Sequence, residues 1–161
     1  MTRLVPRLDE QESAAWLALV SLIELLPSAL DSQLQRDSDM THFEFSVLSL
    51  LRFSPDQTLR MSELAAGTTA TLPRLSHVVT RLEKRGVLER LPRPEDKRAT
   101  NVRLTDLGRR ALIRATPGHI ELVRSAVIER LDRDQLSQLA DIATSITRAL
   151  DPEGRFTSRM D

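Results

Sequence analysis

The stretch R-P-E-D-K-R-A-T-N-V-R-L-T-D-L-G, from Arg93 to Gly108, decides how this chain folds. It begins with a proline-broken cluster of charges, continues through strand-like residues, and ends where Thr105 can start a helix. The run V-L-E-R-L at 87–91 also reads as a strand. Two short strands joined by a polar loop predict a β-hairpin, with strands over 87–91 and 99–104 and a charged loop over 92–98.

The residues before the hairpin predict two short helices joined by a tight turn. Leu59 and Arg60 can form a short strand before them. Ser62 starts the first helix, which ends near Gly67, and a polar turn follows at 68–71. The second helix spans about 72–85, because Thr71 can cap it, proline is tolerated in its first turn, and glycine stops it. Its apolar face consists of Leu75, Val78, Val79 and Leu82. This order predicts a winged helix-turn-helix, whose second helix lies in the DNA major groove.

Longer helices flank this unit on both sides. Apolar residues recur at helical spacing over 9–35, with Pro27 expected to kink the helix. Thr41 and Glu44 form a capping box for the next helix. A long helix is expected from Thr105 through Leu131, with a kink or a short break at Pro117-Gly118, and a last helix over 134–150. The fold class is therefore mainly α with a small β-hairpin wing, in a single domain over 1–161. Within it, dimerisation helices at 10–36 and 108–150 flank a DNA-binding lobe at 41–105.

Composition excludes several classes of protein. The chain has 161 residues and no cysteine, which removes disulfides, thiolate metal sites and cysteine nucleophiles. It also lacks the Gly-rich phosphate loops, nucleophile elbows and paired metal-binding histidines of common enzymes, so we expect no enzyme and no cofactor. The N-terminus has no signal-like apolar region, and no uninterrupted run approaches about 18 apolar residues. We expect a cytoplasmic protein that contacts no membrane.

Charge is balanced over the chain but not along it. The whole sequence has 23 basic and 23 acidic residues, whereas residues 72–110 contain eleven Lys/Arg and five Asp/Glu, a local net charge of +6. Such a patch attracts an anionic partner. The helix over 72–85 carries basic residues opposite its apolar face, and we interpret this stripe as reading double-stranded DNA. A solvated helix face is the alternative. The expected DNA-binding residues on and beside this helix are Thr71, Arg74, Ser76, His77, Thr80, Arg81 and Lys84.

The tip of the hairpin extends the same interpretation. Arg93, Lys97 and Arg98 lie where a wing reaches phosphates or the minor groove, which favours cations. An acidic residue is unexpected beside DNA. Asp96 is therefore interpreted as a brace that holds Arg81 or Arg98 in one rotamer through a charge-assisted pair.

The wing stretch resembles the signature of the MarR family of bacterial regulators. In that pattern an Asp, a basic residue and an Arg in the wing are followed by Leu-Thr and a Gly, and Asp96, Lys97, Arg98, Leu104, Thr105 and Gly108 fit it. The run M-S-E-L-A-A-G-T-T-A-T-L-P-R-L-S-H-V-V-T-R-L-E-K-R-G-V-L-E-R is similar to the family's helix-turn-helix. The resemblance covers about residues 10–150. Arg93 departs from it, because many members have an acidic residue there.

The resemblance implies a homodimer, most often a repressor of a nearby operon or its own gene. The rich apolar stripes of the terminal helices favour the same assembly, which would bind a pseudo-palindromic operator. Many members release DNA when a small aromatic anion binds, and the candidate lining here is Trp16, Val20, His42, Phe43, Phe45 and Arg114. Ordinary core packing is the alternative for these residues, so no ligand-binding site is assigned.

Two other classes of protein stay open. A winged helix can serve protein contacts alone, but such a module would be expected to lose its cationic stripe. A metal-responsive regulator could use His42, Glu44 and His119, although nothing pairs them at ligand spacing. We assign no metal site.

Overall fold

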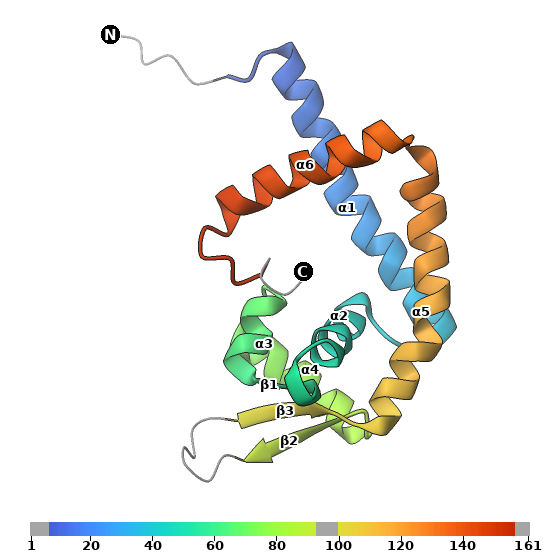
Figure 1. Ribbon diagram of the computed structural model, residues 1–161, viewed down its shortest axis with the longest axis vertical. Helices are drawn as coiled ribbons and strands as arrows, with labels where there is room; N and C mark the ends of the chain where they lie inside the picture. Colours follow the sequence, from blue (N-terminus) through green and yellow to red (C-terminus); the bar gives the residue numbers. More distant parts are fainter. Residues whose placement is uncertain (1–6, 93–99, 157–161) are drawn as a thin grey trace.

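The computed structural model describes residues 7–92 and 100–156 of the chain as helices around a small antiparallel sheet (Figure 1). This arrangement confirms the predicted winged helix-turn-helix. In chain order the elements are α1 (Glu10–Ser38), α2 (His42–Arg52), η1 (Pro55–Gln57), β1 (Thr58–Arg60), α3 (Met61–Gly67), α4 (Leu72–Lys84), β2 (Leu88–Pro92), β3 (Thr100–Leu104), α5 (Asp106–Ala126), η2 (Ile128–Arg130) and α6 (Arg133–Leu150).

Local signals set most of the helix ends. Thr41 caps α2 and forms the predicted capping box with Glu44. Thr71 caps α4, which has a proline in its first turn. Gly86 takes a φ of 73° just after α4, a left-handed conformation that suits glycine and turns the chain into β2.

The sheet has three strands in the order β1-β3-β2, in which β1, the short strand expected at Leu59 and Arg60, joins the predicted hairpin. β2 pairs with β3 in antiparallel register, with Arg90 opposite Val102. β1 pairs with the other edge of β3, with Leu59 opposite the same Val102. The strand before α3 is thereby joined to the base of the wing, so the helix-turn-helix and the wing share one sheet.

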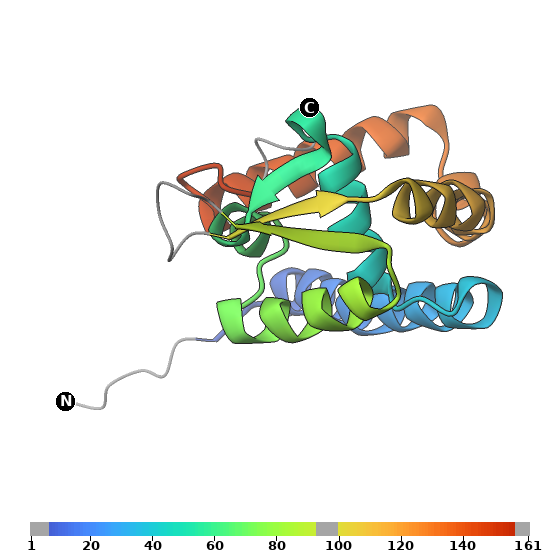
Figure 2. The same ribbon diagram turned by 90° about the horizontal axis from the view of Figure 1, so that it is seen from below.

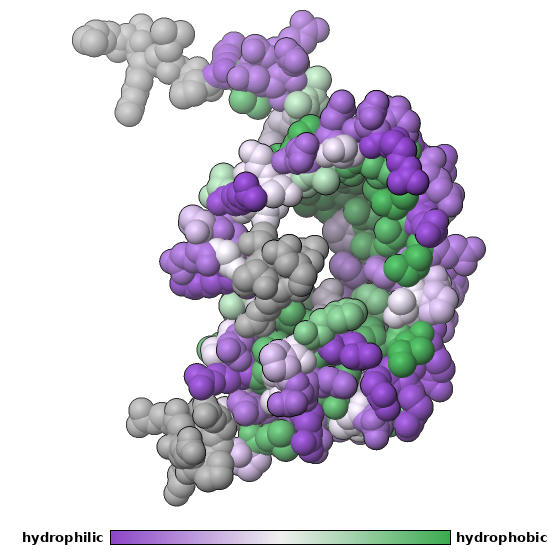
Figure 3. All heavy atoms as spheres, in the orientation of Figure 1, coloured by the Kyte–Doolittle hydropathy of each residue, from purple (hydrophilic) through white to green (hydrophobic). Residues whose placement is uncertain are grey.

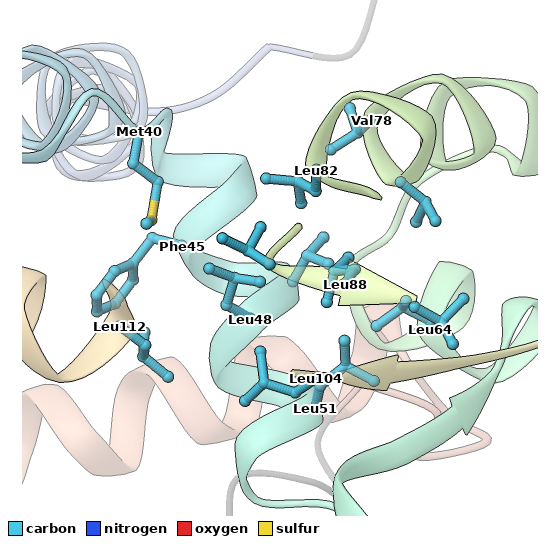
Figure 4. Packing of buried hydrophobic residues seen from close by; sticks show 14 of the residues in the cluster. Met40, Phe45, Leu48, Leu51, Leu64, Val78, Leu82, Leu88, Leu104 and Leu112 are labelled. Carbon is cyan, nitrogen blue, oxygen red and sulfur yellow. The ribbon is translucent and has the colours of Figure 1, made fainter. Parts of the chain in front are cut away.

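The core lies between α2, α4 and the sheet (Figure 4). The predicted apolar face of α4 is buried as expected. α2 contributes Val47, Leu48 and Leu51, and the strands contribute Leu88, Val102 and Leu104, all buried. Burial of this cluster fixes α4 to the sheet, with its opposite side turned to solvent.

The residues of the wing signature form a lock at the base of the wing. The Thr105 hydroxyl donates to the Gly86 carbonyl at 2.7 Å and accepts from the Gly108 backbone N–H at 3.1 Å. A Cβ on Gly108 would lie 2.1 Å from the Val87 carbonyl oxygen, so only glycine allows this approach. The signature therefore holds the start of α5 against the start of β2.

Both long helices continue through their prolines. α5 continues through Pro117 to Ala126, so the predicted short break is wrong, and η2 rather than helix lies just before Leu131. Gly118 packs so closely on α1 that a Cβ there would lie 3.0 Å from Gln33 Nε2. The stabilisation from packing α5 against α1 therefore exceeds the cost of the backbone hydrogen bond that Pro117 removes. α1 likewise runs as one helix through Pro27.

The outer helices present large apolar side chains to solvent. α6 crosses α1 in Figure 1 but lies well apart from it in Figure 2. The buried residues of α1 are confined to its C-terminal half, and no residue of α6, all of which are described, is buried. Green apolar residues gather along α1 and α5 in Figure 3. Exposed members of these faces include Trp16, Leu17, Leu25, Ile113, Ile120, Ile142 and Leu150.

Candidate DNA-binding surface

The solvent-facing side of α4 carries the predicted cationic stripe. Arg74, His77, Arg81 and Lys84 are all exposed, and all lie opposite the buried face of the helix. Spacings of three and four residues align them along one side. The stripe is therefore accessible over the full length of α4, and its side chains can reach base edges and phosphates.

Arg90 of β2, which sequence reasoning missed, joins the wing to α4. Its guanidinium pairs with Glu83 and donates to the Thr80 hydroxyl at 2.9 Å and to the Ser76 carbonyl at 3.1 Å. Ser76 and Thr80, predicted to contact DNA, thus lie on the side of α4 that faces β2. An arginine inside a predicted strand was the available signal, because a half-buried arginine needs acceptors.

Glu44 of α2 is the second residue that the sequence did not assign to this surface. Its side chain is 2 % exposed, and its Oε1 accepts from Arg81 Nε at 2.9 Å. Arg85 Nη1 lies 3.7 Å from the same oxygen. The predicted brace, Asp96, lies outside the described residues, as do Arg93, Lys97 and Arg98. Within the described part of the chain, Arg81 has Glu44 as its carboxylate partner.

Arg74 connects the stripe to a cavity behind α4. Its guanidinium carbon lies 4.5 Å from the centre of the Phe43 ring, a cation–π contact. The cavity has a volume of about 560 Å³ and lies between α2, α5 and the turn before α4. Aromatic rings, hydroxyls and three cationic or titratable side chains line it: His42, Phe43, Phe45, Ser46, Ser49, Leu50, Phe53, Gly67, Thr68, Thr69, Arg74, His119 and Phe156.

Two histidines meet in this cavity from α2 and α5. The rings of His42 and His119 stack with centroids 6.2 Å apart, and His119 also packs on Phe45 at 4.4 Å. Burial lowers the pKa of His119, and the neighbouring His42 lowers it further. Burial also lowers the pKa of His42, while the Asp31 carboxylate opposes this shift. Both rings are therefore held toward their neutral form.

The structure brings together half of the predicted ligand lining. His42, Phe43 and Phe45 line the cavity, whereas Trp16, Val20 and Arg114 do not. Trp16 is 54 % exposed on α1. Of the metal trio, His42 and His119 lie together, but the Glu44 carboxylate is engaged by the Thr41 backbone N–H and by Arg81. Over residues 7–92 and 100–156, no group of three or more His, Asp or Glu is placed to hold a metal ion.

Known proteins resemble this chain in sequence as well as in fold. The MarR family model matches residues 40–100. The chain is 41 % identical to Sco3205, a MarR family transcriptional regulator from Streptomyces coelicolor solved in complex with DNA, with a TM-score of 0.87 over 93 % of this chain and 94 % of that one. It is 25 % identical to NadR, solved in complex with 4-hydroxyphenylacetate, with a TM-score of 0.66 over 88 % and 97 %. It is 28 % identical over 122 residues to the Bacillus subtilis transcriptional repressor YetL, covering 70 % of this chain and 72 % of that one.

These similarities agree with the fold and the cationic surface described above. Sco3205 aligns over nearly the whole of both chains, so the likeness includes the outer helices as well as the winged lobe. The lock at Thr105 and Gly108 and the cationic side of α4 lie in the parts of the fold that define a winged DNA reader. The fold and family are those of transcriptional regulators rather than enzymes. The chain belongs to the MarR family of transcriptional regulators.

Proposed function

We propose that this regulator is a cytoplasmic homodimer that represses a nearby operon or its own gene by binding a pseudo-palindromic operator. The cationic stripe of α4 carries the proposal, because it is exposed and aligned, and because Arg74 and Arg81 contact Phe43 and Glu44 of α2. α4 enters the major groove, and the wing residues Arg93, Lys97 and Arg98 contact phosphates or the minor groove beside it. Thr71 lies at the N-terminus of α4, where a backbone phosphate is favoured.

Dimerisation through α1, α5 and α6 is supported by their uncovered apolar faces. Monomeric proteins rarely expose so many large apolar side chains on adjoining helices. By length and composition alone, α1 could also cross a membrane. A helix buried between two subunits requires the same composition, and the capped, polar ends of α1 suit an interface in water.

A planar aromatic anion is the proposed effector. The cavity offers Phe43, Phe45 and Phe53 to an aromatic ring and Arg74 and His119 to an acidic group. The bound 4-hydroxyphenylacetate of NadR has this chemistry. An occupant would contact Arg74, so it could change DNA affinity only by binding the free and the DNA-bound forms unequally.

The test is fluorescence anisotropy with duplexes from the region upstream of the gene, against shuffled duplexes, at 50 and 200 mM salt. We expect two subunits per site, preference for the native sequence, and a loss of about 10³-fold or more in affinity between the two salts. Addition of 4-hydroxyphenylacetate as a probe should release the operator if the cavity takes aromatic acids. Equal, weak binding to both duplexes would contradict operator recognition.

A further inference from the structure

Glu44 is buried although its local role does not require burial. As the third residue of α2, it accepts a hydrogen bond from the Thr41 backbone N–H at 2.8 Å through Oε2. Glu12 of α1 makes the same capping contact at 2.8 Å, and Glu63 of α3 makes it at 2.9 Å. Both of those side chains are exposed, whereas Glu44 is 2 % exposed. Something other than capping therefore accounts for the position of the Glu44 carboxylate.

The difference is the second oxygen of Glu44. Oε1 accepts from Arg81 Nε at 2.9 Å and lies 3.7 Å from Arg85 Nη1. A carboxylate removed from water is costly unless it is paired and hydrogen-bonded, and these two arginines, in the last turn of α4 and just after it, satisfy that condition. One side chain thus links the first turn of α2 to the last turns of α4, across 37 residues of sequence.

Among the described residues, Glu44 holds Arg81 at one edge, through Nε. The Arg81 side chain stays 48 % exposed, and within the described part of the chain its terminal nitrogens make no hydrogen bond. A guanidinium fixed in this way loses less freedom when it binds a base edge or a phosphate, because its rotamer is already chosen. Arg81 is therefore an oriented donor on the DNA-facing side of α4.

The Glu44–Arg81 pair lies beside a polar cavity between α1 and α4. A cavity of about 250 Å³ separates the end of α1 from the end of α4, with Gln35, Asp39, Met40 and Thr41 on the α1 side. Asp39 lies 3.8 Å from Arg85 across it. Polar contacts rather than close apolar packing therefore join the dimerisation helix to the DNA-reading helix at this corner.

We propose that Glu44 is a positioning residue for DNA recognition, which orients Arg81 so that it discriminates between sequences rather than adding general affinity. This inference rests on the proposed role of α4 in the major groove. Glu44 also carries a negative charge close to the DNA-facing surface, so it opposes nonspecific attraction to phosphates. Both effects favour the operator over other DNA.

The variant Glu44→Gln separates positioning from folding. Glutamine can accept the Thr41 hydrogen bond and has nearly the same volume, so the capping box is kept. The substitution removes the negative charge of the Glu44 carboxylate, which pairs with Arg81. We expect random duplexes to bind as tightly as before or more tightly, and the ratio of operator to random affinity to fall about tenfold, within the range of one bidentate contact. Glu12→Gln alters a capping box in which the described residues form no ion pair, and it should leave the ratio unchanged.

The experiment uses full-length protein and an operator duplex selected from a random pool by the wild-type chain. Anisotropy gives operator and random affinities for wild type, Glu44→Gln, Arg81→Gln and the double variant, and thermal melting gives stability. If Glu44 acts through Arg81, the double variant will discriminate no worse than Arg81→Gln alone. An unchanged ratio in Glu44→Gln would overturn the proposal. So would equal losses on both duplexes, with a lowered Tm, because they would indicate a structural role.

Two further outcomes keep the inference separate from the proposed function. If Glu44→Gln does not fold, the same measurement is made with Arg81→Lys. Lysine keeps the positive charge, but it lacks the planar guanidinium that can bind Glu44 and DNA at the same time. Discrimination should then fall about tenfold with random affinity kept, and wild-type behaviour of Arg81→Lys would overturn the proposal. Failure of the wild-type chain to select any sequence would instead overturn operator recognition itself, before any variant is compared.

Discussion

His77 is the α4 side chain best placed to test base reading alone. It is exposed near the middle of the helix, so replacing it leaves the core and the ion pairs intact. We predict that His77→Ala lowers operator affinity by about 1–3 kcal/mol while affinity for shuffled DNA barely changes, because a lost base contact costs only where the correct base is present. Anisotropy with both duplexes measures this.

Lys84 offers the matched comparison on the same stripe. Lysine acts as a point charge toward phosphates, so Lys84→Ala should weaken binding to all duplexes alike and reduce the salt slope by about one. If His77→Ala and Lys84→Ala give the same pattern on operator and shuffled DNA, the division of α4 into base-reading and phosphate-binding positions is wrong.

The paired histidines of the cavity make stability depend on pH. The pKa of each is lowered in the folded protein, mainly by burial, so the unfolded chain binds protons more readily. Folding stability is then fully present above the unfolded histidine pKa of about 6.5 and is lost as pH falls below it. We predict a lower Tm at pH 5.5 than at pH 7.5.

The variant His119→Phe isolates this effect. Phenylalanine can keep the ring contact with Phe45 but cannot take up a proton, so the drop in Tm between pH 7.5 and 5.5 should shrink. Carboxylates titrate mostly at lower pH and act as a shared background in both proteins. A pH profile identical to that of the wild type would show that the pair does not control stability in this range.

At the scale of elements, the lock between α5 and the wing is the contact to break. Thr105→Ala removes the N-cap of α5 and its hydrogen bond to Gly86, which should cost about 1 kcal/mol. Gly108→Ala forces a Cβ toward the Val87 carbonyl and should cost about 1–3 kcal/mol. Urea unfolding monitored by circular dichroism measures both losses.

Gly154, which is partly exposed, provides a control for the glycine substitution. It also has a positive φ, at 63°, but lies in the turn after α6, away from the core. Gly154→Ala should therefore show only the backbone cost, on the order of 1 kcal/mol. If Gly108→Ala is no more destabilising than Gly154→Ala, close packing is not what requires glycine in the wing signature.

The elements that could be predicted from sequence are those specified by neighbouring residues. The Thr41–Glu44 capping box, the Thr71 cap and the glycine after α4 act within a few positions, so α2 and α4 begin and end close to the predicted residues. The buried face of α4 followed from its apolar spacing alone. Such signals need no knowledge of the rest of the chain.

Contacts between distant segments were not predictable in the same way. The pairing of β1 with β3 joins Thr58 to Arg103, and no local pattern specifies it. Glu44 read as a helix cap, and nothing near it in sequence indicated Arg81 as a second partner. Pro117 was expected to allow a break, because the packing of Gly118 on α1 appears only once both helices are placed.

At the scale of the whole molecule, the exposed face of α6 should hold the dimer together. Ile142 is 58 % exposed in the middle of this helix. We predict that Ile142→Glu converts the dimer to monomers, because it would bury two charges across a two-fold interface, and that operator binding is lost with it. Light scattering coupled to gel filtration gives the mass, and anisotropy gives the binding.

Ser137→Glu, at an exposed polar position on the opposite side of α6, adds the same charge as a control. It should keep both the dimer and DNA binding. A dimer that survives Ile142→Glu with unchanged stability would place the subunit interface elsewhere on the molecule.

The order of the helices along the chain has a consequence during synthesis. α1 leaves the ribosome first, yet α5, the helix that packs on it, is complete only 88 residues later, at Ala126 rather than Ser38. At bacterial elongation speeds this interval lasts roughly 4–18 s, which is long compared with helix formation. We therefore expect nascent-chain chaperones to bind the apolar side of α1, and the cell's yield of this regulator to depend on them.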